Sequence, residues 1–162
     1  MNKYQKKQFL RSIVSSMFDT IYDKTICIYG VAFKANTSDF RESAALYILK
    51  NLLNDGARIK IYDPCVNYDE FLKYAKKHIF VEKEMEEKMT MVECPYVAAK
   101  HSHAIVICTE WDIFKNLNYE TIYHDMMKPA FVFDGRIILD VKKMLELGFK
   151  VYSIGYLTPS FF

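Results

Sequence analysis

Two cations, Lys34 and Arg41, lie in the segment Gly30-Val-Ala-Phe-Lys-Ala-Asn-Thr-Ser-Asp-Phe-Arg-Glu-Ser43, which follows a short apolar run. Ser43 stands where a helix is expected to begin, and an anion at a helix start meets free N–H groups and the positive end of the helix dipole. The NAD fingerprint needs three spaced glycines, whereas this segment has only Gly30. The segment therefore either binds an anion without being an ordinary NAD loop, or is a connection with solvated cations and a helix cap.

A third cation, Arg136, ends the sequence Phe133-Asp-Gly-Arg136, which overlaps another apolar run. A guanidinium at the end of a strand offers a planar fork that suits a phosphate or a carboxylate. The alternative is an ion pair between Arg136 and Asp134 or Asp140. The sequence alone leaves both interpretations open.

Two further segments follow strand-like runs, Asp63 with its neighbour Pro64 and the sequence Cys108-Thr-Glu-Trp-Asp112. The Asp63 carboxylate could hold a ribose, but a turn that ends a strand is the preferred interpretation. Trp111 is interpreted as a packing residue rather than as a platform for a ligand.

The cysteines are widely spaced and form no Cys-x-x-Cys pair; they are Cys27, Cys65, Cys94 and Cys108. Cys27 and Cys108 lie in apolar runs, which predicts buried, reduced thiols and a reducing compartment such as the cytoplasm. No cysteine has the neighbouring His and carboxylate pattern of a nucleophile. His101 and His103 lack a third ligand, so we predict no metal site.

Apolar periodicity predicts the elements that position these residues. Strands are expected at 25–29, 58–62, 89–92, 104–108, 130–133 and 150–154, and helices at 5–22, 43–54, 68–77, 95–101, 119–127 and 141–147. The alternation predicts an α/β fold with a doubly wound, mostly parallel, Rossmann-like sheet, preceded by one long amphipathic helix. Ligands of such sheets bind beyond the carboxyl ends of the strands, which selects the four segments above as candidate positions.

A chain of 162 residues with a net charge of +2 predicts one domain and excludes a dedicated nucleic-acid surface. No apolar run approaches the roughly 18 residues of a membrane span, so we expect no membrane partner. The first helix carries a wide apolar stripe. We expect that stripe to be partly uncovered and to favour self-association through Phe9, Ile13, Met17 and Phe18.

Five stretches together resemble the UDP-glucose 6-dehydrogenase family, particularly its animal-type sequences. They are Gly30-Val-Ala-Phe-Lys34, Thr37-Ser-Asp-Phe-Arg-Glu-Ser43, Ile61-Tyr-Asp-Pro64, Ala104-Ile-Val-Ile-Cys-Thr-Glu-Trp-Asp112 and Lys128-Pro-Ala-Phe-Val-Phe-Asp-Gly-Arg136. Their shared order makes the resemblance specific, and it covers nearly the whole chain.

The resemblance implies a parent enzyme that oxidises UDP-glucose to UDP-glucuronate in two NAD-dependent steps, with this chain as its C-terminal, UDP-binding domain. It implies that Phe33, Lys34 and Arg136 contact the substrate, and that Arg41 reaches an NAD molecule held mainly by the N-terminal domain. It also implies a homo-oligomer. The family's NAD fingerprint and its Gly-Phe-Gly-Gly-x-Cys nucleophile motif do not occur in this sequence. We therefore expect the chain alone to be inactive, with no catalytic residue of its own.

The resemblance also divides the chain into three parts. Residues 1–22 match the end of the family's central connecting helix, residues 23–157 form the UDP-sugar-binding α/β domain, and residues 158–162 form a tail. Met1 is then expected to be an artificial start, with a natural short chain as the alternative. Two other hypotheses are a stand-alone nucleotide-sugar-binding or regulatory module and a sister dehydrogenase for another sugar nucleotide, such as GDP-mannose.

Overall fold

Seven strands form a single sheet in the computed structural model, which describes residues 1–17, 20–154 and 156–157. The strands are β1 (Thr25–Tyr29), β2 (Arg58–Tyr62), β3 (Met89–Met91), β4 (Ala104–Ile107), β5 (Phe131–Asp134), β6 (Lys150–Ser153) and β7 (Tyr156–Leu157). Their order is β3-β2-β1-β4-β5-β6-β7, and only β7 is antiparallel to its neighbour. The first six strands have the order of a doubly wound dinucleotide-binding fold, which confirms the predicted fold class.

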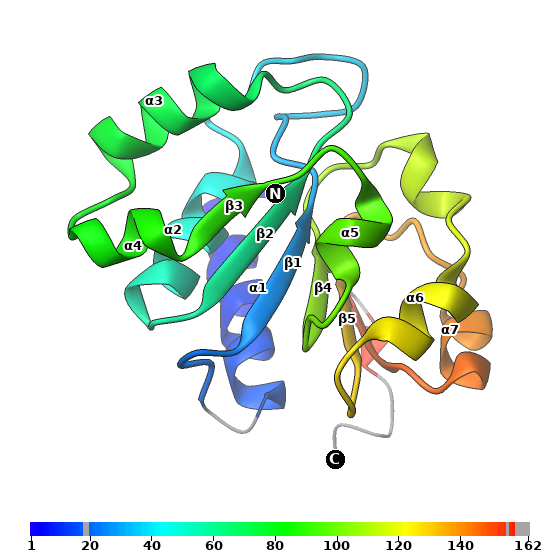
Figure 1. Ribbon diagram of the computed structural model, residues 1–162. Coiled ribbons are helices and arrows are strands. Elements are labelled where there is room, and N and C mark those ends of the chain that lie inside the picture. The colour runs from blue at the N-terminus through cyan, green and yellow to red at the C-terminus, as the bar shows by residue number, and fades with distance from the viewer. Residues whose placement is uncertain (18–19, 155, 158–162) are drawn as a thin grey trace.

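Helices cover both faces of this sheet, with α1 and α2 on one face and α5 and α6 on the other (Figure 1). The helices are α1 (Lys3–Ser16), α2 (Ala44–Asn54), α3 (Tyr68–His78), α4 (Lys83–Glu87), α5 (Pro95–Ala99), the 3-10 helix η1 (Asp112–Lys115), α6 (Tyr119–Asp125) and α7 (Val141–Leu147). Ser43 caps α2, because its Oγ accepts a hydrogen bond from the Ala45 N–H at 3.0 Å. Gly56 follows this helix with a φ of 87°, as expected for the residue after a helix end.

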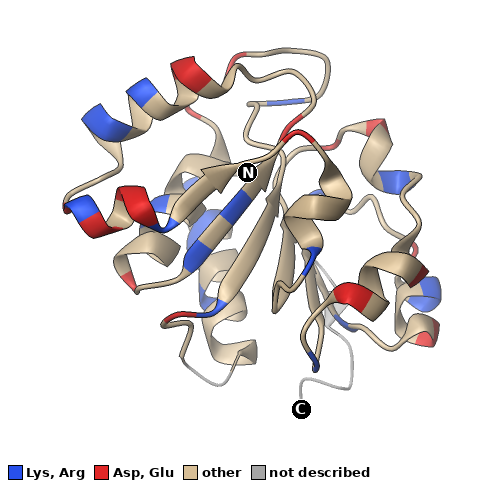
Figure 2. Ribbon diagram, viewed as in Figure 1, with Lys and Arg blue, Asp and Glu red and all other residues tan. Residues whose placement is uncertain are grey.

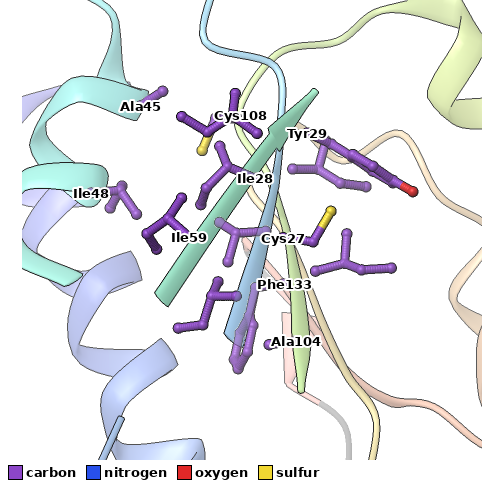
Figure 3. Packing of buried hydrophobic residues seen from close by; sticks show 14 of the residues in the cluster. Cys27, Ile28, Tyr29, Ala45, Ile48, Ile59, Ala104, Cys108 and Phe133 are labelled. Atoms are coloured by element: carbon purple, nitrogen blue, oxygen red, sulfur yellow. The ribbon is translucent and has the colours of Figure 1, made fainter. Parts of the chain in front are cut away.

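The hydrophobic core lies on both sides of the central strands. Ile28 points toward Ile48 of α2, whereas Cys27 and Tyr29 point to the opposite face of the sheet (Figure 3). These three side chains of β1 are fully buried. A strand that is covered on both faces reads as a continuous apolar run rather than as an alternating one, which is why the central strands were easy to predict.

The first helix departs from the sequence prediction in two ways. It ends at Ser16 rather than at residue 22, because Met17 leaves the helical conformation (φ −94°, ψ 34°) and the chain must turn back to enter β1. The side chains of Phe9, Ile13 and Met17 are at most 1% exposed. The prediction of an uncovered stripe was therefore wrong for these residues, because the stripe packs on the domain's own sheet. Phe18 lies outside the described residues.

Smaller differences occur where the sequence is polar or the element short. A helix, α4, forms in a polar stretch and buries Met85 against the rest of the core. The predicted helices at 95–101 and 119–127 end at Ala99 and Asp125. Acidic and basic residues are interleaved around the molecule (Figure 2). Within the described residues, no helix combines the length and apolar character needed to cross a bilayer.

Candidate ligand-binding site

The strand order reverses between β1 and β4, and doubly wound sheets bind their ligands in the crevice at such a reversal. Four connections meet at this edge of the sheet. We name them the β1 loop (residues 30–43), the β2 turn (63–66), the β4 loop (108–111) and the β5 loop (135–140). They overlap the four segments selected from the sequence, although Asp112 begins η1 and Phe133 and Asp134 end β5.

Asp63, which follows β2, joins three of these connections and is only 8% exposed. Its carboxylate oxygens accept hydrogen bonds from the backbone N–H groups of Val31 (2.9 Å), Ala32 (3.0 Å), Cys65 (2.9 Å) and Val66 (3.1 Å), and from Trp111 Nε1 (3.2 Å). The carboxylate is thus occupied by protein donors rather than open to a ribose. The turn interpretation of Asp63 is confirmed, and so is the packing role of Trp111, which is 7% exposed.

The β1 and β4 loops approach each other closely at Gly30 and Thr109. Gly30 has a φ of 92°, and a Cβ placed there would lie 2.4 Å from the Cβ of Thr109. The Thr109 hydroxyl donates a hydrogen bond to the carbonyl oxygen of Ala32 at 2.8 Å. Because Thr109 fills this space and Asp63 uses the N–H groups of Val31 and Ala32, a dinucleotide pyrophosphate does not fit here as it does in an NAD loop.

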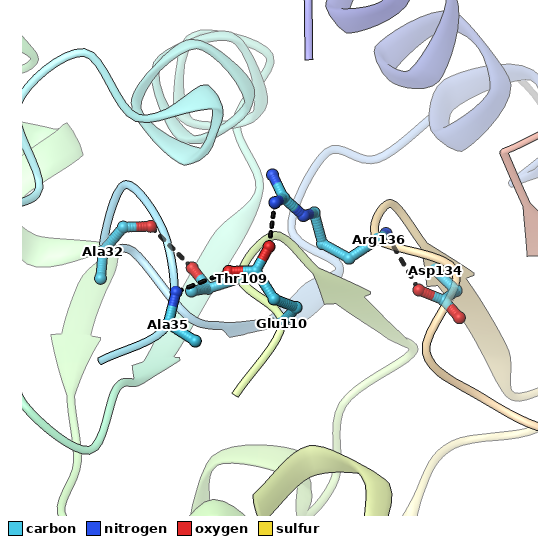
Figure 4. Close-up of polar contacts among 6 residues, drawn as sticks. All are labelled: Ala32, Ala35, Thr109, Glu110, Asp134 and Arg136. Atoms are coloured by element: carbon cyan, nitrogen blue, oxygen red, sulfur yellow. Dashed lines mark hydrogen bonds and ion pairs between the residues drawn. The ribbon is translucent and has the colours of Figure 1, made fainter. Parts of the chain in front are cut away.

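Glu110 links the β1 loop to the β5 loop (Figure 4). Its Oε1 accepts a hydrogen bond from the Ala35 N–H at 2.5 Å, and its Oε2 pairs with Nη2 of Arg136. The Arg136 and Glu110 side chains are 26% and 30% exposed, so the pair is partly accessible to solvent at this edge of the sheet. The proposed pairing of the Arg136 guanidinium with Asp134 or Asp140 was wrong.

Asp134 instead shapes the backbone of the β5 loop that carries Arg136. This fully buried carboxylate accepts hydrogen bonds from the N–H groups of Arg136 (3.0 Å), Ile138 (2.8 Å) and Leu139 (2.8 Å). Between them, Ile137 has a φ of 57°, which is unusual for a β-branched residue, and it is 67% exposed. Strained backbone of this kind often marks a functional loop.

The other predicted contact residues lie on the outer part of the β1 loop. Phe33 is 52% exposed, and the Lys34 Nζ lies 6.0 Å from the centre of its ring. The structure thus brings the Lys34-bearing loop and Arg136 together through Glu110. Arg41 is separate from this arrangement, because its exposed side chain pairs with Asp39 of its own loop at 3.3 Å.

Burial keeps two thiols protonated. It raises the pKa of Cys27 above its ordinary value, and it raises the pKa of Cys108 to about 12 although the charge of Arg136 acts in the opposite direction. Cys65 is exposed and Cys94 half-buried. The described part of the chain contains no cluster of three His, Cys, Asp or Glu side chains that could hold a metal ion.

Residues 27–141 match a family model described as "UDP-glucose/GDP-mannose dehydrogenase family, UDP binding domain". Over 96% of its length the chain is 45% identical to the UDP-glucose 6-dehydrogenase of Drosophila melanogaster and 42% identical to that of Caenorhabditis elegans. It spans about a third of the length of these curated relatives (33% and 32%).

Solved structures show the same arrangement of elements. A UDP-glucose dehydrogenase from Pyrobaculum islandicum is similar with a TM-score of 0.67 and 25% identity, over 94% of this chain and 29% of that one. An NDP-N-acetyl-D-galactosaminuronic acid dehydrogenase from Methanosarcina mazei has a TM-score of 0.73 at 16% identity, over 95% of this chain and 29% of that one. The second likeness supports the fold alone.

Proposed function

This chain belongs to the UDP-glucose/GDP-mannose dehydrogenase family, whose UDP binding domain it matches, and from that premise we propose that it binds the UDP moiety of a nucleotide sugar in the crevice between β1 and β4. The observation that carries the proposal is the junction of two cation-bearing loops at the point where the strand order reverses. In this proposal Lys34 and Arg136 bind the diphosphate, and the exposed ring of Phe33 contacts the substrate.

The proposal extends to the whole enzyme. The identity of 42–45% to UDP-glucose 6-dehydrogenases supports oxidation of UDP-glucose to UDP-glucuronate, with α1 as the end of a connecting helix. NAD would be held mainly by another domain, because the turn after β1 lacks the spaced glycines of an NAD loop and its Val31 and Ala32 N–H groups are bound to Asp63, and Arg41 would face that NAD. A homo-oligomer that works in the cytoplasm completes the proposal, and the free cysteines of this chain are consistent with that compartment.

Isothermal titration calorimetry with UDP tests the site. Charge-assisted hydrogen bonds contribute roughly 1.5–3 kcal/mol each, so Lys34→Ala and Arg136→Ala should each weaken binding by about 10- to 150-fold. Arg136→Lys should restore part of the loss, because an ammonium group cannot reproduce the planar fork. Arg41→Ala is the matched control and should bind UDP like the wild type. Equal affinity in the wild type, Lys34→Ala and Arg136→Ala would show that the site is misplaced.

The 162-residue chain should not oxidise UDP-glucose by itself. Its thiols at Cys27 and Cys108 are buried and protonated, and the Gly-Phe-Gly-Gly-x-Cys nucleophile motif of the family does not occur in the sequence. NADH absorbance during incubation with UDP-glucose and NAD measures this. Turnover that disappears on substitution of one of the cysteines would contradict the expectation.

A further inference from the structure

We propose that Glu110 is a competitor built into the binding site: its carboxylate holds the donors that the diphosphate of the ligand would use, and it thereby lowers the affinity for the nucleotide. The proposal rests on the UDP-binding function above and specifies how that site is regulated. Glu110 therefore has a role distinct from those of the cations that bind the ligand.

The donors that meet at Glu110 are the kind that bind phosphate. One is the backbone N–H of Ala35, next to Lys34 in the β1 loop, and the other is the planar guanidinium of Arg136. A carboxylate and a phosphate present similar pairs of oxygen atoms to such donors. Figure 4 shows the Glu110 carboxylate between Ala35 and Arg136, bonded to both. A ligand anion that bridged the two loops would need the same donors.

Two other carboxylates at this edge, those of Asp63 and Asp134, are bound much more firmly than that of Glu110. Asp63 and Asp134 are 8% and 0% exposed, and each accepts hydrogen bonds from at least three backbone N–H groups. Glu110 has one backbone donor, and its side chain is 30% exposed, so it can exchange with a ligand at lower cost. The position of the β1 loop does not depend on Glu110 alone, because Asp63 and the Thr109 hydroxyl also hold this loop.

The negative charge of Glu110 explains why this residue should weaken the binding of a diphosphate. A diphosphate that binds the Ala35 N–H and Arg136 brings its negative charges close to the Glu110 carboxylate, in a partly desolvated position where repulsion is weakly screened. Glu110 must therefore leave its donors, or stay and repel the ligand. Either way, a neutral side chain at this position should bind the nucleotide more tightly.

The variant Glu110→Gln tests this, because it keeps the shape of the side chain and an oxygen that can accept from the Ala35 N–H. Calorimetry with UDP and with inorganic pyrophosphate should show binding about tenfold tighter than in the wild type. Asp112→Asn is the matched control: it removes the same charge two residues away, from a side chain that is 91% exposed and paired with Lys115. Its affinities should stay within about twofold of the wild type.

A double-mutant cycle separates competition from a general charge effect. In an Arg136→Ala background one of the two contested donors is absent, so the gain in affinity from Glu110→Gln should be much less than tenfold. Glu110→Asp keeps the charge but shortens the reach to both donors. Its gain in affinity should be smaller than that of Glu110→Gln. Circular dichroism and the melting temperature of each variant establish that it is folded before it is titrated.

The proposal is overturned if folded Glu110→Gln binds pyrophosphate and UDP no more tightly than the wild type. Weaker binding would identify Glu110 as a residue that positions Arg136. If the wild type binds pyrophosphate but not UDP, the UDP-binding function fails, while the pyrophosphate affinities still decide the role of Glu110. If neither the wild type nor Glu110→Gln binds either probe, both proposals fail.

Discussion

At the scale of single residues, two buried carboxylates organise the site without being free to bind a ligand. Asp63 ties the β1 loop, the β2 turn and Trp111 together, and Asp134 shapes the loop that carries Arg136. An ionised carboxylate is the natural centre for such a cluster because it accepts hydrogen bonds only. The cations of the site are thus held by a frame of buried acids.

Removal of the Asp63 carboxylate should destabilise the whole domain. Asp63→Ala leaves several buried N–H groups without an acceptor, and a buried unsatisfied donor costs about 1–3 kcal/mol. We expect the free energy of unfolding in urea to fall by about 3 kcal/mol. Asp112→Ala, which removes a side chain 91% exposed, should change it by less than about 0.5 kcal/mol. Similar values for the two variants would contradict the role assigned to Asp63.

The sequence predicted some of these residues and not others. The turn at Asp63 and the packing of Trp111 follow from local chemistry, and both were confirmed. The partner of Arg136 was not predictable, because Glu110 is 26 residues away and meets it only after β4 and β5 pair. A carboxylate three residues after the end of β4, beside the point where the strand order reverses, was the available signal.

At the scale of elements, α1 is part of the domain core rather than an appendage. Phe9 is 1% exposed, and it approaches the β5 loop so closely that a Cβ on Gly135 would lie 3.0 Å from its ring. The packing of α1 therefore contributes to the position of the loop that carries Arg136. The sequence predicted the helix itself from its apolar period but not its end, because Met17 and Ile21 continue the period although both lie beyond the helix.

A large-to-small substitution in α1 should therefore affect stability strongly. Phe9→Ala should lower the free energy of unfolding by about 3–5 kcal/mol, the usual cost of removing a buried aromatic ring. Tyr4→Ala is a control on the same helix, since Tyr4 is 69% exposed, and its effect should stay within about 0.5 kcal/mol. Urea denaturation of both variants measures this. A tolerated Phe9→Ala would mean that α1 is only loosely attached.

At the scale of the whole molecule, burial of titratable groups predicts loss of stability in alkali. Burial raises the pKa of Cys27, Tyr29, Cys108 and Tyr119, with Cys108 at about 12 against an ordinary value of 9.0. When the pH exceeds their ordinary pKa values, these groups keep their protons in the folded state but release them when the chain unfolds. Their contribution to stability is therefore complete below about pH 9 and is lost as the pH rises toward about 12.

We expect the free energy of unfolding to fall between about pH 9 and about pH 11, by up to roughly 1.4 kcal/mol per pH unit for each thiol that ionises on unfolding. Cys108→Ala should show a shallower fall than the wild type, because one such group is missing. Urea titrations at several pH values give both slopes. A free energy that stays constant over this range would contradict the burial of these thiols.

The central claim for the molecule is that UDP binds where the β1, β4 and β5 loops meet. The most direct measurement is the change in backbone amide chemical shifts when a nitrogen-15-labelled chain is titrated with UDP. We predict that the largest shifts cluster in those three loops, with the Ala35 and Arg136 amides among them. The contrary result would be shifts at the amino ends of β2 and β3, around the cavity of about 540 Å³ that Tyr22, Gly56 and Lys88 help to line, or no shifts at all.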